Sequence, residues 1–238
     1  MKTMVVGGSR GLGRALIEGL GKPGDRLIGV SRSQPEGLVL VPGINLSWIE
    51  ADLGEPVAAV EQIASQTPDD LDVLIYNVGI WEEQAFNEQY SFLDDSDASI
   101  RKLVDVNITA TLLLLKRLVP KLLTSSRPQL ILTGSTSALR QSGRPEVAFG
   151  ASKFALNGMA DALREGFRHQ KLAVTVLHLG YLNTDDPLST PLQDAGQRGG
   201  GQWVPVHDVV TMVDALLRLS DASFVRELVM PAIADERF

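Results

Sequence analysis

Phe149 and Lys153 lie four residues apart in the stretch VAFGASKFAL, residues 147–156. Residues at this spacing share one face of a helix, so both side chains would face the same pocket. A tyrosine at the first position would supply a phenol proton, and the lysine charge would lower the phenol pKa toward the working pH. Phe149 has a ring of similar shape but no proton to donate. The stretch therefore predicts a proton-transfer site that has kept its lysine and lacks its acid.

A glycine-rich turn near the N-terminus is the second feature with chemical content. The stretch VVGGSRGLGRAL, residues 5–16, places Gly7, Gly11 and Gly13 between a predicted strand and a predicted helix. Glycine permits a tight turn and lets a pyrophosphate approach the backbone N–H groups at a helix N-terminus. The turn predicts a dinucleotide site, which also includes Ser9, Arg10 and Leu12.

The end of the second predicted strand indicates which dinucleotide binds. A carboxylate there would bind the ribose 2′-hydroxyl of NAD and repel a 2′-phosphate. This chain has Ser31, Arg32 and Ser33 instead, and Arg10 adds a second guanidinium inside the glycine turn. Because arginine forms bidentate charge-assisted hydrogen bonds to phosphate, the sequence favours NADP(H) over NAD(H).

Short apolar runs alternate with longer helical patterns along the chain. Near-continuous apolarity is typical of strands buried on both faces of a parallel sheet, and the alternation favours right-handed βαβ units. We therefore expect one domain, residues 1–238, with a doubly wound Rossmann-type parallel sheet between two layers of helices. Strands are predicted at 3–7, 26–30, 46–50, 72–76, 129–134, 172–179 and 227–231, and helices at 11–21, 55–66, 97–123, 147–170 and 207–219.

The composition argues against several classes of function. A net charge of −7 makes nucleic acid an unsuitable partner. The absence of cysteine excludes disulfides and thiolate chemistry and suits a cytoplasmic protein. No apolar run is long enough to predict a membrane span. The three histidines His169, His178 and His207 lack metal-ligand spacing, so no metal site is predicted.

Several motifs, in their order along the chain, resemble those of the short-chain dehydrogenase/reductase family. They are the glycine turn, YNVG at 76–79, Asn107 in VDVN, LTGSTSA at 132–138 and FGASK at 149–153. The resemblance covers most of the chain and implies a nicotinamide-dependent oxidoreductase acting on a carbonyl or alcohol. It implies cofactor contacts at Asp52 with its neighbour Leu53, at Asn77 and Gly79, at Lys153, and at Gly180 and Thr184 of LGYLNT.

The resemblance also implies catalytic roles. Lys153 would bind the nicotinamide ribose, and Asn107 would hold a water of the family's proton relay. The hydroxyl that binds the substrate carbonyl is Ser135 by the local G-S-T pattern or Thr136 by its spacing from Phe149, and we prefer Ser135. Phe149 itself stands at the position of the family's catalytic tyrosine.

Four interpretations of this departure remain open. The chain is a reductase with another proton donor, such as Ser135, Thr136, Tyr181 or an ordered water near Lys153 and Asn107; or it acts on an activated substrate that needs no strong acid. Alternatively, it is a catalytically silent NADP(H)-binding sensor or partner protein, or a Tyr→Phe variant of an active reductase. The retained Asn107, Lys153 and strand-end hydroxyls favour an oxidoreductase whose proton-transfer step is impaired or rerouted.

The substrate pocket is expected to be apolar or aromatic. Trp81, Phe86, Tyr181 and Trp203 lie in segments expected to face it, and no cluster of basic residues in the sequence indicates a charged substrate. The segment 184–203, rich in proline, glycine and polar residues, is either a surface loop or a flexible lid over this pocket.

Two predicted helices bear on oligomerisation. Helices 97–123 and 147–170 carry apolar stripes, part of which must face the chain's own sheet. In the family that the sequence resembles, these two helices pair across a two-fold axis. We therefore expect a homodimer through them.

Overall fold

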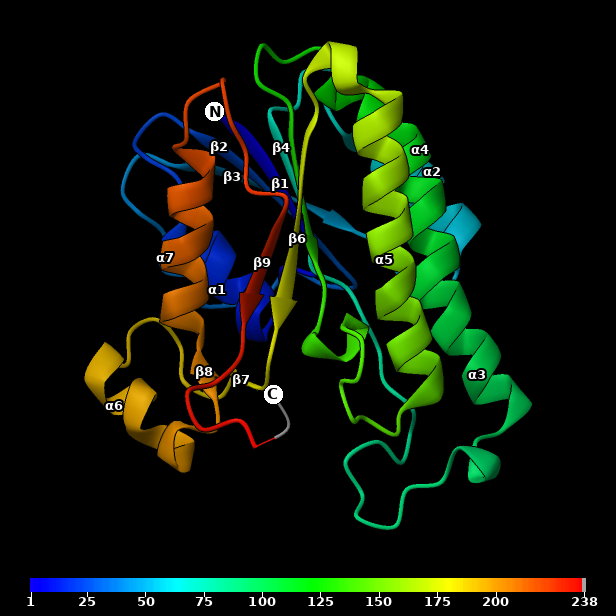
Figure 1. Cartoon of the computed structure of the whole chain (residues 1–238). Coiled ribbons are helices and arrows are strands. Elements are labelled where there is room, and N and C mark those ends of the chain that lie inside the picture. Colours follow the sequence, from blue (N-terminus) through cyan, green and yellow to red (C-terminus); the bar gives the residue numbers. More distant parts are fainter. Residues whose placement is uncertain (237–238) are drawn as a thin grey trace.

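Seven short strands form one parallel sheet in the computed structural model, which describes residues 1–236 (Figure 1). Their spatial order is β3-β2-β1-β4-β5-β6-β9, the doubly wound arrangement predicted from the sequence. β4 and β5 are buried at every position, as expected of strands covered on both faces. The strands are β1 (Lys2–Val6), β2 (Arg26–Ser31), β3 (Asn45–Glu50), β4 (Val73–Tyr76), β5 (Gln129–Thr133), β6 (Ala173–Leu179) and β9 (Glu227–Met230).

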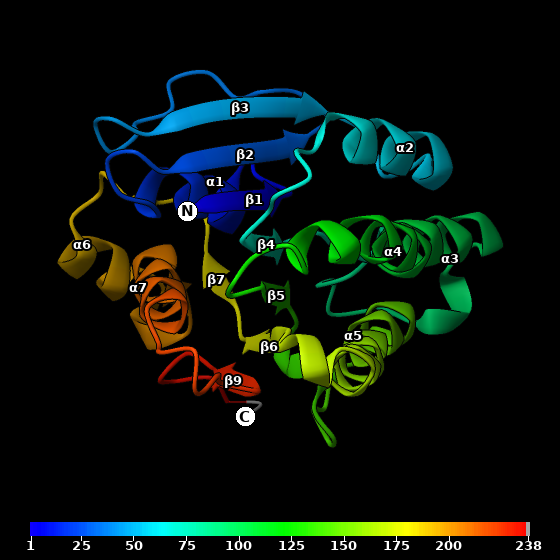
Figure 2. The same cartoon turned by 90° about the horizontal axis from the view of Figure 1, so that it is seen from above.

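Helices cover both faces of the sheet and enclose one hydrophobic core on each side (Figure 2). Helices α1 (Gly11–Gly19) and α7 (Val206–Leu217) pack together on one face. On the other face lie α2 (Pro56–Gln66), α4 (Ala110–Leu122) and α5 (Val147–Gly166). The structure thus confirms the three-layer α/β fold that the alternating pattern predicted.

The predicted helix 97–123 is not uniform. It consists of α3 (Asp97–Val104), a π-helical turn over Asp105–Thr109, and α4. A π-helical turn widens the helix by one residue and is often found at functional sites. Here it contains Asn107, whose carbonyl accepts a hydrogen bond from the Thr111 hydroxyl at 2.8 Å. The sequence pattern carries no signal for this insertion.

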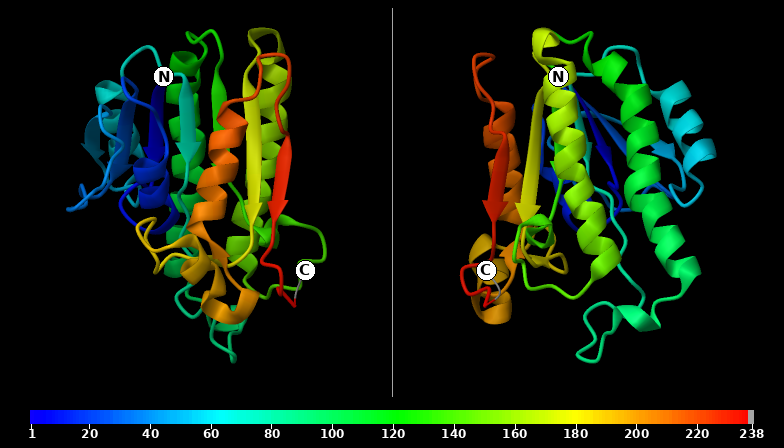
Figure 3. Two further views of the ribbon diagram at one scale, coloured as in Figure 1. Left: turned by 90° about the vertical axis from the view of Figure 1, so that its left-hand side faces the viewer. Right: turned by 45° about the vertical axis from the view of Figure 1, so that its right-hand side comes forward.

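The segment 184–203 contains more secondary structure than its composition suggested. It lies between two short paired strands, β7 (Leu182–Asn183) and β8 (Val204–Pro205), and contains the helix α6 (Leu192–Gln197). The amide of Asn183 donates to the Asp186 carboxylate at 2.7 Å and to the Ala195 carbonyl at 3.1 Å. These tertiary hydrogen bonds order the segment at the carboxyl end of the sheet (Figure 3). Its opening as a lid stays a prediction.

Candidate functional site

The carboxyl ends of β1, β4, β5 and β6 meet at one edge of the sheet, as parallel strands require. The glycine turn after β1 therefore lies beside Asn77 after β4, whose backbone N–H donates to Val6 O at 2.9 Å. A ligand that binds an open α/β sheet does so in the crevice at this edge.

Glycine is required in the turn because neighbouring backbone atoms leave no room for a Cβ. A Cβ on Gly7 would lie 2.1 Å from the Asn77 carbonyl oxygen, and one on Gly13 would lie 1.9 Å from the Gly7 carbonyl oxygen. Gly7 and Gly11 also have φ values of 85° and 52°, in the left-handed region that favours glycine. No side chain caps the N-terminus of α1, which begins at Gly11. The turn therefore leaves the first N–H groups of α1 available to an anionic ligand such as a pyrophosphate.

The nicotinamide end of the predicted cofactor site approaches this turn. The Thr184 side chain lies 3.2 Å from the position that a Cβ on Gly11 would take. Gly180, four residues earlier, donates its N–H to Met230 O at 3.0 Å, and a Cβ there would come 3.1 Å from Pro231 Cα. The close packing of Gly180 against the β9 end directs the following segment back toward the phosphate turn.

The adenosine end shows two exposed arginines, Arg10 and Arg32, which form no ion pair within residues 1–236. The Ser31 hydroxyl donates to Ser33 O at 2.7 Å, which turns the chain at the end of β2. Asp52 accepts from the Gly54 N–H at 3.0 Å, and its neighbour Leu53 is buried. Two guanidiniums open to solvent fit a phosphate at this end of the site.

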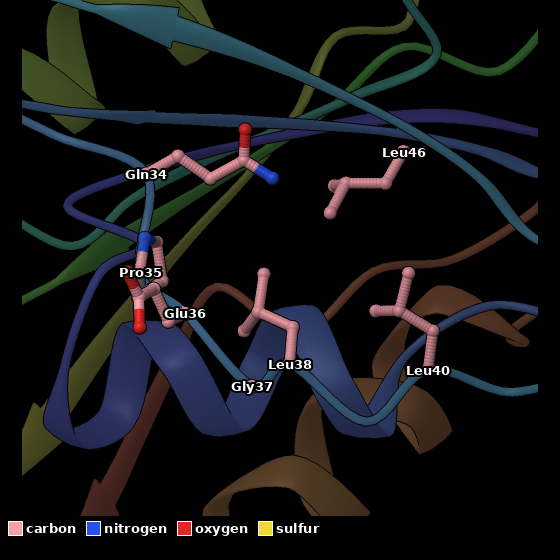
Figure 4. Close-up of a pocket in the computed structure, with 7 residues that line it drawn as sticks. All are labelled: Gln34, Pro35, Glu36, Gly37, Leu38, Leu40 and Leu46. Carbon is pink, nitrogen blue, oxygen red and sulfur yellow. The ribbon is translucent and has the colours of Figure 1, made fainter.

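A hollow of about 590 Å³ lies between β3 and the coil that follows β2 (Figure 4). Leu38 and Leu40 of the coil and Leu46 of β3 point into it above α1. None of the residues predicted for the site lines this hollow. It lies where the connection between β2 and β3 contains no helix.

Lys153 is buried and held by two carbonyls at strand ends. Its Nζ donates to Thr133 O at 2.9 Å and to Val78 O at 3.2 Å. Burial lowers the pKa of Lys153 to about 8, because the surroundings disfavour the charged ammonium. A Cβ on Gly79 would lie only 3.0 Å from Nζ, so this glycine makes room for the lysine.

The Asn107 side chain connects three segments. Its Oδ1 accepts from Ile80 N–H at 2.8 Å, and its Nδ2 donates to Ile80 O at 2.9 Å and to the Ser152 hydroxyl at 3.0 Å. The Ser152 hydroxyl donates in turn to Phe149 O at 2.7 Å. Asn107 thus fixes the chain after β4 against the first turns of α5. Its contact with a relay water stays a prediction.

Phe149 is almost completely buried, with 3% of its surface exposed. The Trp81 ring stacks on it with centroids 3.3 Å apart and planes 14° from parallel. Lys153 Nζ lies 5.5 Å from the Phe149 centroid, and the Phe149 backbone N–H donates to Glu82 Oε1 at 2.8 Å. The ring therefore lies beside the lysine, under an aromatic cover, and offers no hydroxyl.

The predicted aromatic pocket residues separate into two groups. Phe86 contacts both Trp81 and Tyr181, with centroids 4.6 and 5.9 Å apart, so these three rings form one cluster. Trp203 instead packs against Gly199 in the segment between β7 and β8. The cluster extends from Phe149 toward the nicotinamide segment and makes this side of the site aromatic.

The two candidate hydroxyls differ in their bonding. Ser135 Oγ accepts from Ser137 N–H at 3.1 Å and so caps the short helix Thr136–Ala138. The Thr136 hydroxyl forms no hydrogen bond within the described residues, although the residue is buried. Both hydroxyls belong to the end of β5, where a substrate carbonyl would lie.

Three residues at the site were not predicted from the sequence. Buried Glu82 anchors the backbone of Phe149. Arg144 donates to the Tyr181 hydroxyl at 2.5 Å and lies 4.2 Å above that ring. Fully buried His178 contacts Ser135 O through Nδ1 at 3.2 Å, and burial lowers its pKa. Their contacts join residues 37 to 67 positions apart in the sequence, so only the tertiary structure reveals them.

A Rossmann-type sheet with a glycine-rich turn at its carboxyl edge is the arrangement of the nucleotide-binding class of α/β proteins. A family model described as short chain dehydrogenase matches residues 2–190, and the chain therefore belongs to the short-chain dehydrogenase/reductase family. In the described residues, no helix combines the length and apolarity needed to cross a membrane.

Relatives and solved structures agree with this assignment. The chain is 25% identical over 236 residues to the 3-oxoacyl-[acyl-carrier-protein] reductase MabA of Mycobacterium tuberculosis, covering 96% of this chain and 89% of the relative. It is 28% identical over 189 residues to the NADPH-dependent pterin aldehyde reductase of Arabidopsis thaliana, covering 76% and 75%. An alcohol dehydrogenase from Thermococcus sibiricus, complexed with 5-hydroxy-NADP, has the same fold with a TM-score of 0.77 at 18% identity, over 98% of this chain and 96% of that one.

Proposed function

We propose that this protein is an NADP(H)-dependent oxidoreductase for a small carbonyl or alcohol substrate, in which Phe149 replaces the family's catalytic tyrosine. The arrangement of Lys153 carries the proposal. Its ammonium is held by Thr133 O and Val78 O and lies 5.5 Å from the Phe149 ring, at the same sheet edge as the glycine turn. The site thus has a cofactor-binding lysine and lacks the neighbouring acid, so proton transfer is impaired or rerouted.

The residues at the sheet edge fit a nicotinamide dinucleotide. The glycine turn and the N-terminus of α1 would hold the pyrophosphate, Arg10 and Arg32 the 2′-phosphate, and Lys153 the nicotinamide ribose. NADPH supplies the hydride when it is bound. The preference for NADP(H) is supported by the missing carboxylate after β2 and by relatives whose descriptions include NADP or NADPH.

The proton has two candidate sources at the site. Lys153 uses two of its three N–H groups on carbonyls, and a pKa of about 8 suits donation of the third proton to a water at neutral pH. The unpaired Thr136 hydroxyl can donate its proton to the substrate oxygen and regain one from Lys153 through that water. We therefore favour Thr136 over Ser135 as the substrate-binding hydroxyl, since Ser135 Oγ already caps a helix.

The aromatic cluster of Trp81, Phe86 and Tyr181 supports an apolar or aromatic substrate. The same cluster gives the second candidate function some support. Trp81 covers the Phe149 ring, and Phe149 is only 3% exposed. A silent NADP(H)-binding sensor or partner protein needs no access of a substrate to this position. The absence of cysteine supports a cytoplasmic location for either function.

The two functions are separated by measuring NADPH binding and NADPH oxidation on the same preparation. Fluorescence titration gives the Kd, and absorbance at the nicotinamide band follows turnover with a panel of aldehydes, ketones and quinones. The oxidoreductase proposal predicts saturable binding together with slow turnover of at least one apolar carbonyl. Saturable binding with no turnover of any compound, in this chain and in Phe149→Tyr, would establish the silent binder instead.

A further inference from the structure

A second pocket lies at the opposite end of the sheet from the glycine turn. It has a volume of about 440 Å³, within the usual range for small-molecule sites. Its walls come from the residues before β5, the C-terminal half of α5, the start of β6 and the segment before β9. β6 spans roughly 20 Å at about 3.3 Å per residue, so this pocket is separate from the site at the other end of that strand.

The pocket concentrates positive charge in an acidic protein. Five of its residues are basic and three are acidic, whereas the whole chain has a net charge of −7. The basic residues are Arg127, Arg164, Arg168, Lys171 and Arg226, and the acidic ones are Asp161, Glu165 and Asp221. Three of the basic residues lie within residues 164–171, and the fold adds Arg127 and Arg226 from distant segments.

The Asp161 carboxylate bridges two of the guanidiniums. Asp161 Oδ1 accepts from Arg164 Nη1 and from Arg226 Nη2, both at 2.7 Å. The Arg164 side chain is only 10% exposed and is fixed further by Val174 O and Arg226 O at 2.9 and 2.7 Å. Burial, together with repulsion from Arg226, lowers the pKa of Arg164. Arg226 Nε also pairs with Glu227 Oε1 at 3.3 Å, so these two guanidiniums are balanced by two carboxylates, and the excess positive charge of the pocket lies on its other cations.

Two further cations have no partner within residues 1–236. Arg127 is half-buried, yet its guanidinium forms neither a hydrogen bond nor an ion pair, whereas the equally unpaired Lys171 side chain is exposed at the rim of the pocket. The Lys171 backbone is held in the left-handed region, with φ 58° and its N–H bonded to Arg168 O at 3.0 Å. A half-buried cation without a counter-charge loses hydration, and a bound anion would restore the balance.

We propose that this pocket binds a phosphate-bearing small molecule. Arg127 and Lys171 would hold the phosphate, since their two positive charges match the charge of about −1.5 to −2 on a phosphomonoester at pH 7. Leu172 and the Phe224 ring, which is 44% exposed, line the pocket and would contact an apolar part of the ligand. The inference is independent of the reaction at the other end of the sheet.

Calorimetric titration of the full chain with phenyl phosphate tests this site, with inorganic phosphate as the second probe. We expect saturable binding of phenyl phosphate, tighter than that of inorganic phosphate because of the ring. The double variant Arg127→Gln, Lys171→Gln should weaken binding about tenfold or more. Neither side chain has a partner within residues 1–236, so thermal unfolding of this variant should match that of the parent. Phe224→Ala should remove the advantage of phenyl phosphate over inorganic phosphate.

The matched control is Arg10→Gln, Arg32→Gln, which removes two equivalent charges at the glycine turn. It should leave phenyl phosphate binding within about twofold of the parent. Loss of binding in this variant alone would place the phosphate at the cofactor turn and overturn the proposal. The absence of saturable binding up to about 10 mM, or unchanged binding in the Arg127 and Lys171 variant, would overturn it as well.

Discussion

Burial gives the two residues of the FGASK stretch different properties. Lys153 is buried as a cation, with its Nζ bonded to Thr133 O and Val78 O, and its pKa falls to about 8. Phe149 is buried as an apolar ring under Trp81, which costs nothing in desolvation. Burying the Lys153 ammonium therefore lowers the stability of the folded protein, whereas burying the Phe149 ring raises it. A buried cation that destabilises the fold is consistent with a role for Lys153 in binding.

The lowered pKa of Lys153 predicts how stability depends on pH. Below pH 8 the lysine is protonated in both the folded and the unfolded chain, and the full cost of burying the charge applies. Between about pH 8 and 10.5 the folded state releases a proton that the unfolded state still binds, so stability rises with pH. The shift corresponds to about 3 kcal/mol at most. Urea unfolding of the parent and of Lys153→Met across this range should show a rise in the parent that the variant lacks. Parallel curves for the two proteins would contradict the assignment.

Arg32 is expected to determine the preference for NADPH over NADH. In Arg32→Asp the carboxylate would accept a hydrogen bond from a ribose 2′-hydroxyl and repel a 2′-phosphate. We expect the Kd for NADPH to rise about tenfold or more, with the Kd for NADH unchanged or lowered. Fluorescence titration with both nucleotides measures this. Arg218→Asp, at the residue that follows α7, is the control. An equal change for both nucleotides in Arg32→Asp would argue against a phosphate contact.

At the scale of elements, the turn between β1 and α1 tolerates no side chain at its tightest points. Gly13→Ala would place a Cβ 1.9 Å from the Gly7 carbonyl oxygen. We expect loss of nucleotide binding together with a clear fall in the unfolding temperature. Gly158→Ala on α5 is the matched control, because its Cβ would meet nothing within 4 Å. It should stabilise the helix by up to about 1 kcal/mol. A Gly13→Ala protein that binds NADPH like the parent would contradict the account of this turn.

Some helices and strands could be predicted from the sequence and others could not. The strands and long helices were predictable because buried parallel strands are apolar throughout and the covering helices are amphipathic. The π-helical turn at Asn107 and the strands β7 and β8 were not, because side-chain hydrogen bonds from distant segments stabilise them. The glycine turn and Lys153 were predictable from local spacing. Glu82 was not, because its partner lies 67 residues away.

At the scale of the whole molecule, the outer faces of α4 and α5 expose apolar side chains. Leu112 on α4 is 50% exposed, and Phe154 on α5 is 43% exposed. These exposed apolar side chains on both helices are consistent with the proposed homodimer. Phe154→Arg should shift the mass measured by light scattering from dimer to monomer, and Phe224→Arg, on an exposed ring elsewhere, should not. A parent protein that is monomeric at micromolar concentration would contradict the dimer.

We propose that a functional cofactor site lies beside a proton-transfer site that lacks its acid. The most direct test compares the parent with Phe149→Tyr and with Phe149→Leu, which removes the ring without adding a proton. We expect the Kd for NADPH to stay within about twofold in Phe149→Tyr, while kcat/KM for an apolar carbonyl rises by about 10²- to 10⁴-fold, the usual worth of a general acid. Phe149→Leu should show no such gain. Turnover in Phe149→Tyr no faster than in the parent, with NADPH binding intact, would contradict the claim that the missing phenol limits this enzyme.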